Sequence, residues 1–398
     1  MRQLTILTVF ISTLFVTFVS SNTEDLTDIL PESHHSKLFR EIYTQLATSH
    51  YSTVALNDQL SEAYLTAYID RLDSPKRFFM ASDIAEFKKW QYKLDDLAKR
   101  GDLSAGFEIF NLLRERATDR LRHNIELLEN KQHKFDFTLD EHIFLDADDR
   151  DWFIDSKQAD DFWRKAMKDS MIRLMLSGKE QQEARKLLIK RYKALLNRYI
   201  QRNSKDVFQQ YANAFASLYD PHSSYFNPRS SENFQINMSL SLEGIGAQLT
   251  TEDEFTEVVD VITGGPADVQ GILKPKDKII GVGQGDEEIV DVIGWRIDDV
   301  VDLIRGKKGS VVRLQIDSGG SSDKIISIVR DTVKLEEKSA QSHVISIEND
   351  GKKYNIGVIE IPTFYMDFEA ARRQDPNYKS TSRDVRKLLK ELKQQSVD

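Results

Sequence analysis

Residues 242–249 read LEGIGAQL, an apolar octet with one charge, at Glu243, and glycines at positions 244 and 246. Two glycines around one isoleucine indicate backbone that closely approaches another group. A phosphate is one candidate, but phosphate loops place their glycines after a strand and at the start of a helix. Here the glycines precede a predicted strand over 246–250. This order argues against a nucleotide site and favours a carboxylate-binding loop.

Successive backbone N–H groups of such a loop can surround the carboxylate of a chain end, and the strand that follows can pair with the bound peptide. A short helix can form the second wall of the groove. Residues 296–306, RIDDVVDLIRG, have apolar residues at helical spacing, although these residues could instead fill the domain core. The predicted peptide-binding residues are Gly244, Ile245, Gly246, Ala247, Gln248, Leu249, Ile297, Val300, Val301 and Ile304.

The composition restricts the possible chemistry. A chain of 398 residues is long enough for two or three domains. A net charge of −9 without a basic stripe argues against a nucleic-acid partner. The absence of cysteine excludes disulfides, a thiolate nucleophile and cysteine-ligated metals. The histidines lack metal-ligand spacing, and His34 and His35 are expected to form an exposed pair at a helix entry, so no metal or cofactor is predicted.

The first residues are typical of an export signal. Arg2 precedes an uncharged apolar run over 4–19, and Ser20, Ser21 and Asn22 then turn polar. The run is shorter than the roughly 20 residues that a spanning helix needs, although an uncleaved anchor stays open. We expect cleavage after Ser21 and an exported mature chain without an integral membrane segment.

Residues 30–216 are predicted to be helical almost throughout, because prolines and glycines are scarce and apolar residues recur at helical spacing. Asp83 with Glu86 three residues later predicts a capping box at a helix start. The acidic stretch 140–151 lacks the glycine and the terminal glutamate of a calcium loop, so it is interpreted as a solvated connector.

The pattern changes at Asp220-Pro221, where glycine and period-two alternation begin. Short helices are predicted after Pro266 and over 296–305. Predicted strands span 246–250, 257–262, 278–282, 310–316 and 324–330.

A third region begins near Val333. Two predicted strands flank the turn sequence Asn349-Asp350-Gly351, and the β-branched run over 356–361 is typical of a buried strand. An amphipathic helix is predicted over 382–395. Strand, connection and helix form a βα unit without its return strand, so we expect this region to be incomplete.

Several motifs resemble one family in register. GGPA at 264–267 and LKPKDKI at 273–279, between the glycine loop and the short helix, resemble a PDZ domain in its bacterial arrangement over 239–330. The wider segments MSLSLEGIGAQL and VDVIGWRIDDVVDLIRGKKGSVVRLQI look like the PDZ region of the tail-specific, or C-terminal processing, proteases. RLDSPKRFFMASDIAEF and DPHSSYFNPRSSENFQ are similar to the helical N-terminal region of the long periplasmic members, and YNIGVIEIPTFY resembles the first strand of their protease core.

The resemblance implies a multidomain α+β fold. Its expected parts are a signal peptide over 1–21, a helical N-terminal domain over 22–235, a PDZ domain over 236–332, and the incomplete start of a serine-protease core over 333–398. The PDZ-like unit is expected to contain about five strands and two short helices, as a sandwich or barrel.

The resemblance also implies a periplasmic location and an activity, that of an exported serine endopeptidase whose PDZ domain recognises free apolar C-termini of polypeptides. The family's serine nucleophile and lysine base follow a glycine run that this sequence lacks, so both are expected beyond Asp398, and the chain alone is expected to be inactive. The alternative is a non-catalytic peptide-binding module or pseudo-protease of the cell envelope. An envelope adaptor protein stays open as a further partner.

Overall fold

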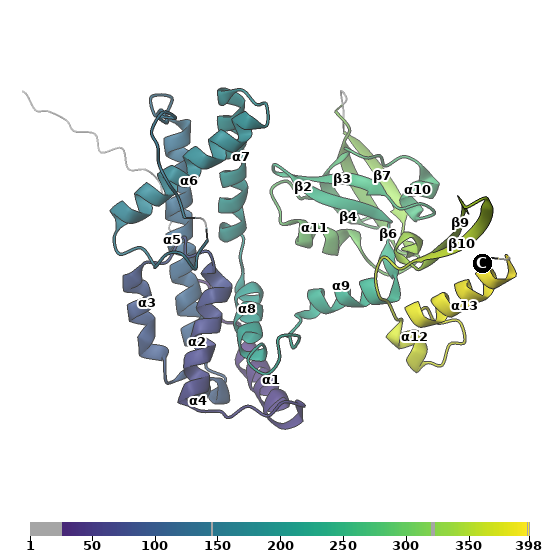
Figure 1. The fold of residues 1–398 in the computed structure, drawn as a ribbon, viewed down its shortest axis with the longest axis horizontal. Coiled ribbons are helices and arrows are strands. Elements are labelled where there is room, and N and C mark those ends of the chain that lie inside the picture. The colour runs from purple at the N-terminus through teal and green to yellow at the C-terminus, as the bar shows by residue number, and fades with distance from the viewer. Residues whose placement is uncertain (1–25, 145, 320–322, 396, 398) are drawn as a thin grey trace, which may run out of the picture.

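The computed structural model describes residues 26–144, 146–319, 323–395 and 397. It has the expected multidomain α+β architecture, with a helical region, a β domain and a smaller C-terminal unit (Figure 1). The predicted signal segment over 1–21 lies outside the described residues. Within the described part of the chain, no helix is long and apolar enough to cross a membrane.

The helical region is formed by helices whose starts the sequence marks. Asn57, Asp155 and Asn203 accept hydrogen bonds from backbone N–H groups in the first turns of α2, α6 and α8. The helices are α1 His35–Ser49, α2 Asp58–Asp73, α3 Ala81–Phe87, α4 Leu94–Arg100, α5 Ser104–Glu129, α6 Ser156–Leu176, α7 Gln181–Ile200 and α8 Ser204–Ala216, with a 3₁₀ turn Lys88–Trp90 after α3.

The core of this region is aromatic and fully buried. The Tyr64 hydroxyl donates to the Tyr211 carbonyl at 3.0 Å, and the Tyr68 hydroxyl donates to the Gly106 carbonyl at 2.9 Å. A Cβ atom at Gly106 would lie 2.6 Å from the Tyr211 ring, so only glycine allows α5 to approach α8 this closely. The acidic stretch 140–151 contains no helix or strand among its described residues.

One local prediction in this region is correct in part and another is wrong. A helix starts where predicted, since α3 spans Ala81–Phe87, but Asp83 is its third residue and not its N-cap; the Asp83 Oδ2 accepts from the Met80 N–H at 2.9 Å. His35 is 2% exposed, because its ring stacks on Phe208 of α8 with centroids 4.4 Å apart. His34 is exposed, as expected. A sequence pattern cannot show which of two adjacent histidines will meet a neighbouring helix.

The β domain contains the predicted strands and both short helices. Its main sheet has the order β2-β3-β4-β6-β7 with antiparallel neighbours, and the short β5 pairs with β4. The elements are β2 Ala247–Glu252, β3 Phe255–Val261, α10 Pro266–Gln270, β4 Lys278–Gln284, β5 Val290–Asp291, α11 Ile297–Ile304, β6 Val311–Asp317 and β7 Lys324–Val329.

One strand pair was not predicted. Strand β1, Ser241–Gly244, pairs antiparallel with β8, Asp331–Lys334, and so joins the two ends of the β domain. The octet 242–249 therefore ends one strand and begins the next, with Ile245 and Gly246 between them. Each strand is only four residues long, which is too short for a clear period-two signal.

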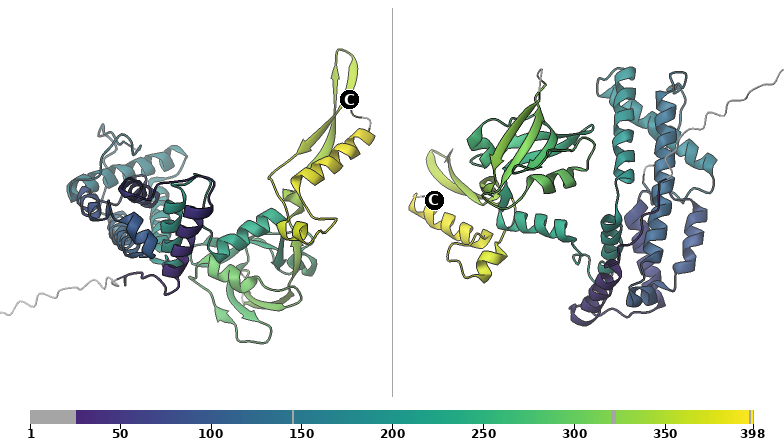
Figure 2. Two further views of the ribbon diagram at one scale, coloured as in Figure 1. Left: turned by 90° about the horizontal axis from the view of Figure 1, so that it is seen from below. Right: turned by 180° about the vertical axis from the view of Figure 1, so that it is seen from behind.

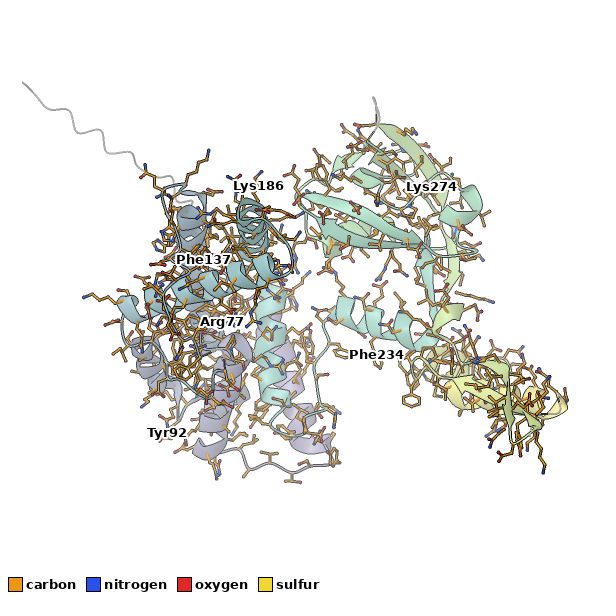
Figure 3. All side chains as sticks on the ribbon, turned by 45° about the horizontal axis from the view of Figure 1, so that its top comes forward. Arg77, Tyr92, Phe137, Lys186, Phe234 and Lys274 are labelled. Carbon is orange, nitrogen blue, oxygen red and sulfur yellow. The ribbon has the colours of Figure 1, made fainter. Side chains whose placement is uncertain are left out.

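Helix α9, Pro228–Ser239, connects the helical region to β1 and continues across the expected boundary at 235 (Figure 1). Figure 3 labels Phe234 on this helix. The C-terminal unit is a hairpin with α13 beside it (Figure 2). It contains a 3₁₀ turn Glu336–Lys338, β9 Gln341–Asn349, β10 Lys352–Glu360, α12 Phe368–Arg372 and α13 Thr381–Gln394, so the predicted hairpin and last helix are confirmed.

The prediction of a buried strand over 356–361 is wrong. Ile356 is 37% exposed and Ile361 is 42% exposed. Strand β10 pairs only with β9 among the described residues, and Leu392 of α13 packs within 3.0 Å of the position that a Cβ at Gly357 would take. One face of the hairpin is thus covered by α13, while the other has no second layer within the described residues.

Candidate peptide-binding groove

The loop between β1 and β2 is held against the chain's own turn. Gly246 has φ +77, which favours glycine, and a Cβ there would lie 3.2 Å from Gly265 Cα and 3.3 Å from Val333 Cγ2. The carbonyl oxygens of Ile245 and Gly246 accept from the N–H groups of Ala267 and Ile262, each at 2.8 Å. The glycine is therefore required by a close approach within the domain, whatever else the loop binds.

The N–H groups of the same two residues are free. Among the described residues, no carbonyl or side chain accepts a hydrogen bond from the N–H of Ile245 or of Gly246. Ile245 is only 3% exposed, and buried N–H groups are normally paired. Two consecutive free donors directly before a strand can bind an anionic group.

Strand β2 follows this loop and forms one edge of the sheet. It pairs with β3 on one side and with no other strand among the described residues. Ala247 and Leu249 are half-buried, whereas Gln248 is exposed, so the apolar side chains face the domain. An open edge of this kind can accept an extended peptide as an additional strand.

Helix α11 packs near β2 and presents two kinds of apolar residue. Val300 and Ile304 are 0% and 3% exposed and belong to the domain core, together with Ile245. Ile297 and Val301 are half-buried, so they remain available to a ligand beside the helix. The fold thus brings the predicted residues onto one loop, one edge strand and one helix, but three of them are core residues that support the groove.

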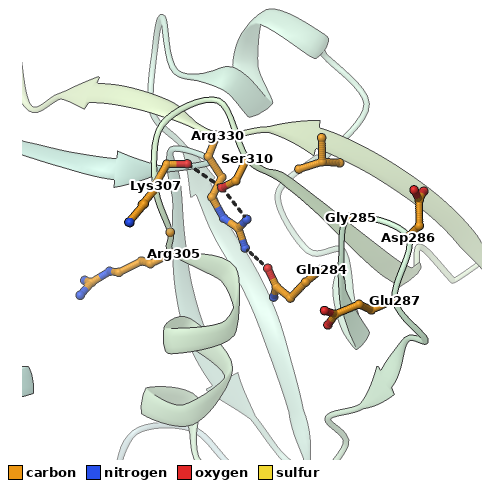
Figure 4. Close-up of a pocket in the computed structure, with 10 residues that line it drawn as sticks. Gln284, Gly285, Asp286, Glu287, Arg305, Lys307, Ser310 and Arg330 are labelled. Carbon is orange, nitrogen blue, oxygen red and sulfur yellow. Dashed lines mark hydrogen bonds between the residues drawn. The ribbon is translucent and has the colours of Figure 1, made fainter.

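Sequence reasoning did not identify Arg330, which holds the C-terminal end of α11. Its guanidinium donates to the Leu303 and Ile304 carbonyls at 2.9 and 2.8 Å. It also donates to Gln284 Oε1 and Ser310 Oγ at 2.7 and 3.0 Å (Figure 4). Burial lowers the pKa of this guanidinium, which is 3% exposed. The sequence feature that could have indicated Arg330 is that this charged residue directly follows the alternating strand 324–329.

The hollow beside Arg330 is distinct from the predicted groove. It has a volume of about 690 Å³ and is lined by Arg305, Lys307, Asp286 and Glu287 among others, with no residue of β2 (Figure 4). Charges of both signs line it, so it shows no clear preference for one class of ligand.

The described residues contain one group that could hold a metal ion. Ligand atoms of Glu32, His34 and His35 lie within 4.8 Å of one another. However, His35 Nδ1 already accepts from the Glu32 N–H at 3.2 Å, and the group lies at the start of α1, where the helix dipole disfavours a cation. This group therefore gives no support for a metal centre.

Family models match most of the chain. The tail specific protease N-terminal domain matches residues 42–229, and the PDZ domain matches residues 233–317. The match to the PDZ domain includes the β1–β2 loop, β2 and α11, so the residues of the groove described above lie within it.

Curated relatives are named as a tail-specific protease and a carboxy-terminal processing protease. The chain is 37% identical to the tail-specific protease of Haemophilus influenzae over 89% of its own length and 48% of that protein. It is 35% identical to the carboxy-terminal processing protease CtpA of Bacillus subtilis over 44% of this chain and 35% of that protein. The chain thus spans about half the length, or less, of these relatives.

A solved structure is also similar in sequence. The PDZ domain of a carboxy-terminal protease from Vibrio cholerae, crystallised with a peptide, is 49% identical and covers 24% of this chain and 100% of that one, with a TM-score of 0.24. The two matched domains and the relatives named above agree with one another. The chain therefore carries the tail specific protease N-terminal domain and a PDZ domain, and it is similar over most of its length to a tail-specific protease.

Proposed function

We propose that this chain is the substrate-recognising part of an exported tail-specific serine endopeptidase. In this proposal the PDZ domain, assigned to residues 236–332, binds the free apolar C-terminus of a polypeptide substrate. The helical region assigned to 22–235 and the C-terminal unit from 333 place this groove relative to the protease core. The matched family domains and the protease names of the relatives support the proposal.

The observation that carries the proposal is the pair of free N–H groups at Ile245 and Gly246, directly before the open edge of β2. The terminal carboxylate accepts from these donors, and the peptide backbone pairs with β2. Apolar side chains of the peptide then pack against half-buried residues of the two walls. Those wall residues are Ala247, Leu249, Ile297 and Val301.

Cleavage in this proposal uses a serine nucleophile and a lysine base. A lysine that is desolvated in a dry site loses its proton near neutral pH and can deprotonate the serine, while backbone N–H groups stabilise the oxyanion. We assign no residue of 1–398 to either role. A non-catalytic envelope module would share the groove and differ only in hydrolysis, and an envelope adaptor remains a further partner of either form.

The proposal is tested by comparing peptides that differ only at the chain end. A dye-labelled decapeptide ending in Val-Val-Leu with a free carboxylate is titrated with the full chain, followed by fluorescence anisotropy, beside the same peptide with a C-terminal amide. We expect the amide to bind at least about tenfold more weakly, because the negative charge that the free N–H groups stabilise is lost. Equal affinity for the two peptides would refute carboxylate recognition.

A further inference from the structure

The groove helix α11 is held from outside the PDZ domain. Arg229, in the first turn of α9, places its guanidinium among three aspartates on the outer side of α11. Its Nη2 lies 2.9 Å from Asp299 Oδ1, its Nε lies 3.1 Å from Asp302 Oδ2, and its Nη1 lies 3.5 Å from Asp298 Oδ2. One cation therefore contacts every acidic residue of this helix.

A second contact holds the N-terminal end of α11. Arg296, which precedes the helix, donates from Nη1 to Asp206 Oδ2 of α8 at 2.8 Å and to the Gln201 carbonyl at 3.1 Å. The side chains of Arg296 and Asp206 are 19% and 15% exposed, so this ion pair is shielded from water. The opposite wall of the groove, β2, is also held from the helical region, because Lys190 Nζ of α7 lies 2.6 Å from Glu252 Oε1 at the end of β2.

A cation beside the three aspartates reduces the repulsion between their negative charges. Asp298 and Asp302 are four residues apart on one helix face, where like charges destabilise a helix. Asp302 also lies in the last turn, where the helix dipole disfavours a negative charge. With α11 only eight residues long, its own hydrogen bonds do little to offset this repulsion.

We propose that Arg229 is a positioning residue of the peptide groove, so that the binding unit extends upstream of the PDZ domain into the helical region. In Figure 1, α11 lies between the sheet and α9, the helix that carries Arg229. The contacts of Arg229 are with the aspartates of α11 and not with its apolar residues. Arg229 fixes the wall against which the peptide packs, and a wall that is already ordered lowers the cost of binding. This inference rests on the proposed function, because it concerns the same groove.

The test measures the affinity of the full chain for the free Val-Val-Leu decapeptide. We expect Arg229→Gln to weaken binding about three- to tenfold, and Arg229→Lys, which keeps the charge, to weaken it by less than about threefold. Arg120→Gln is the matched control, because Arg120 pairs with Asp160 at 2.7 Å within the helical region and should leave the affinity unchanged.

A double-mutant cycle distinguishes positioning from a general loss of stability. In a chain that carries Asp298→Asn, Asp299→Asn and Asp302→Asn, the repulsion is absent, so Arg229→Gln should change the affinity by less than about twofold. Wild-type affinity in Arg229→Gln, or an equal loss in the triple-Asn background, would overturn the inference while leaving the groove intact. Failure of the wild-type chain to bind the free peptide would overturn the proposed function and this inference with it.

Discussion

Replacing Gly246 by alanine tests whether the close approach in the loop, in addition to the backbone conformation, requires glycine. The residue has φ +77, and the left-handed conformation costs an L-residue with a Cβ about 1–2 kcal/mol. The added Cβ would also lie 3.2 Å from the backbone of Gly265, which cannot rotate away as a side chain can. Crowding of this kind adds about 1–2 kcal/mol, so the total expected loss is about 2–4 kcal/mol.

Gly264 provides the matched control. It has φ +76, almost the same as Gly246, but a Cβ there would meet nothing within 4 Å. Gly264→Ala should therefore lose only the conformational part, about 1–2 kcal/mol. The difference between the two variants isolates the crowding against Gly265 and Val333, and it corresponds to roughly a 5- to 30-fold change in the unfolding equilibrium.

Amide hydrogen exchange followed by mass spectrometry is a suitable assay, because it reports the β domain separately from the helical region. Peptides that cover β2 and β3 should exchange faster in Gly246→Ala than in Gly264→Ala, whereas peptides from α5 and α8 should be unchanged in both. If the two variants lost the same protection, the packing argument for Gly246 would be wrong, and only its φ angle would explain the glycine.

Two further predictions concern other parts of the molecule. Arg330→Met should leave the Ile304 carbonyl unpaired, at about 1–3 kcal/mol, while the Leu303 carbonyl keeps its bond from Gln284 Nε2 at 2.7 Å. Amide exchange in α11 should become faster, and unchanged exchange there would contradict the capping role of Arg330. Arg164, and next Lys168, lower the pKa of Glu141 to about 2 from 4.5, so its stabilising effect is present above pH 4.5 and is lost as the pH falls through about 2. The melting temperature of Glu141→Gln should therefore fall less steeply than that of the wild type between pH 4.5 and 2, and parallel curves would argue against this linkage.

Long, regular elements were predictable because local chemistry specifies them. The strand 311–317 alternates between half-buried and buried residues, and Asn203 marks the start of α8 by accepting from N–H groups of its first turn. The strand pair β1–β8 was not predictable, because four residues carry too weak a pattern and their partners are about ninety positions apart, as the register Ser241↔Lys334 shows. His35 was misjudged for a similar reason, since its burial depends on Phe208.

For the groove, the sequence by itself determined the order of loop, strand and helix, and the glycines that permit the turn. The order of these elements and the spacing of apolar residues in 297–304 are local properties that need no distant partner. The close approach of Gly246 to Gly265 and Val333, in contrast, depends on the fold. Only the tertiary structure decided which predicted residues are buried: Val300 and Ile304 are in the core, while Ile297 and Val301 remain half-buried. The same holds for Arg229 and Arg330, because the position of a charge relative to α11 depends on how separate elements pack, and no spacing in the chain encodes that distance.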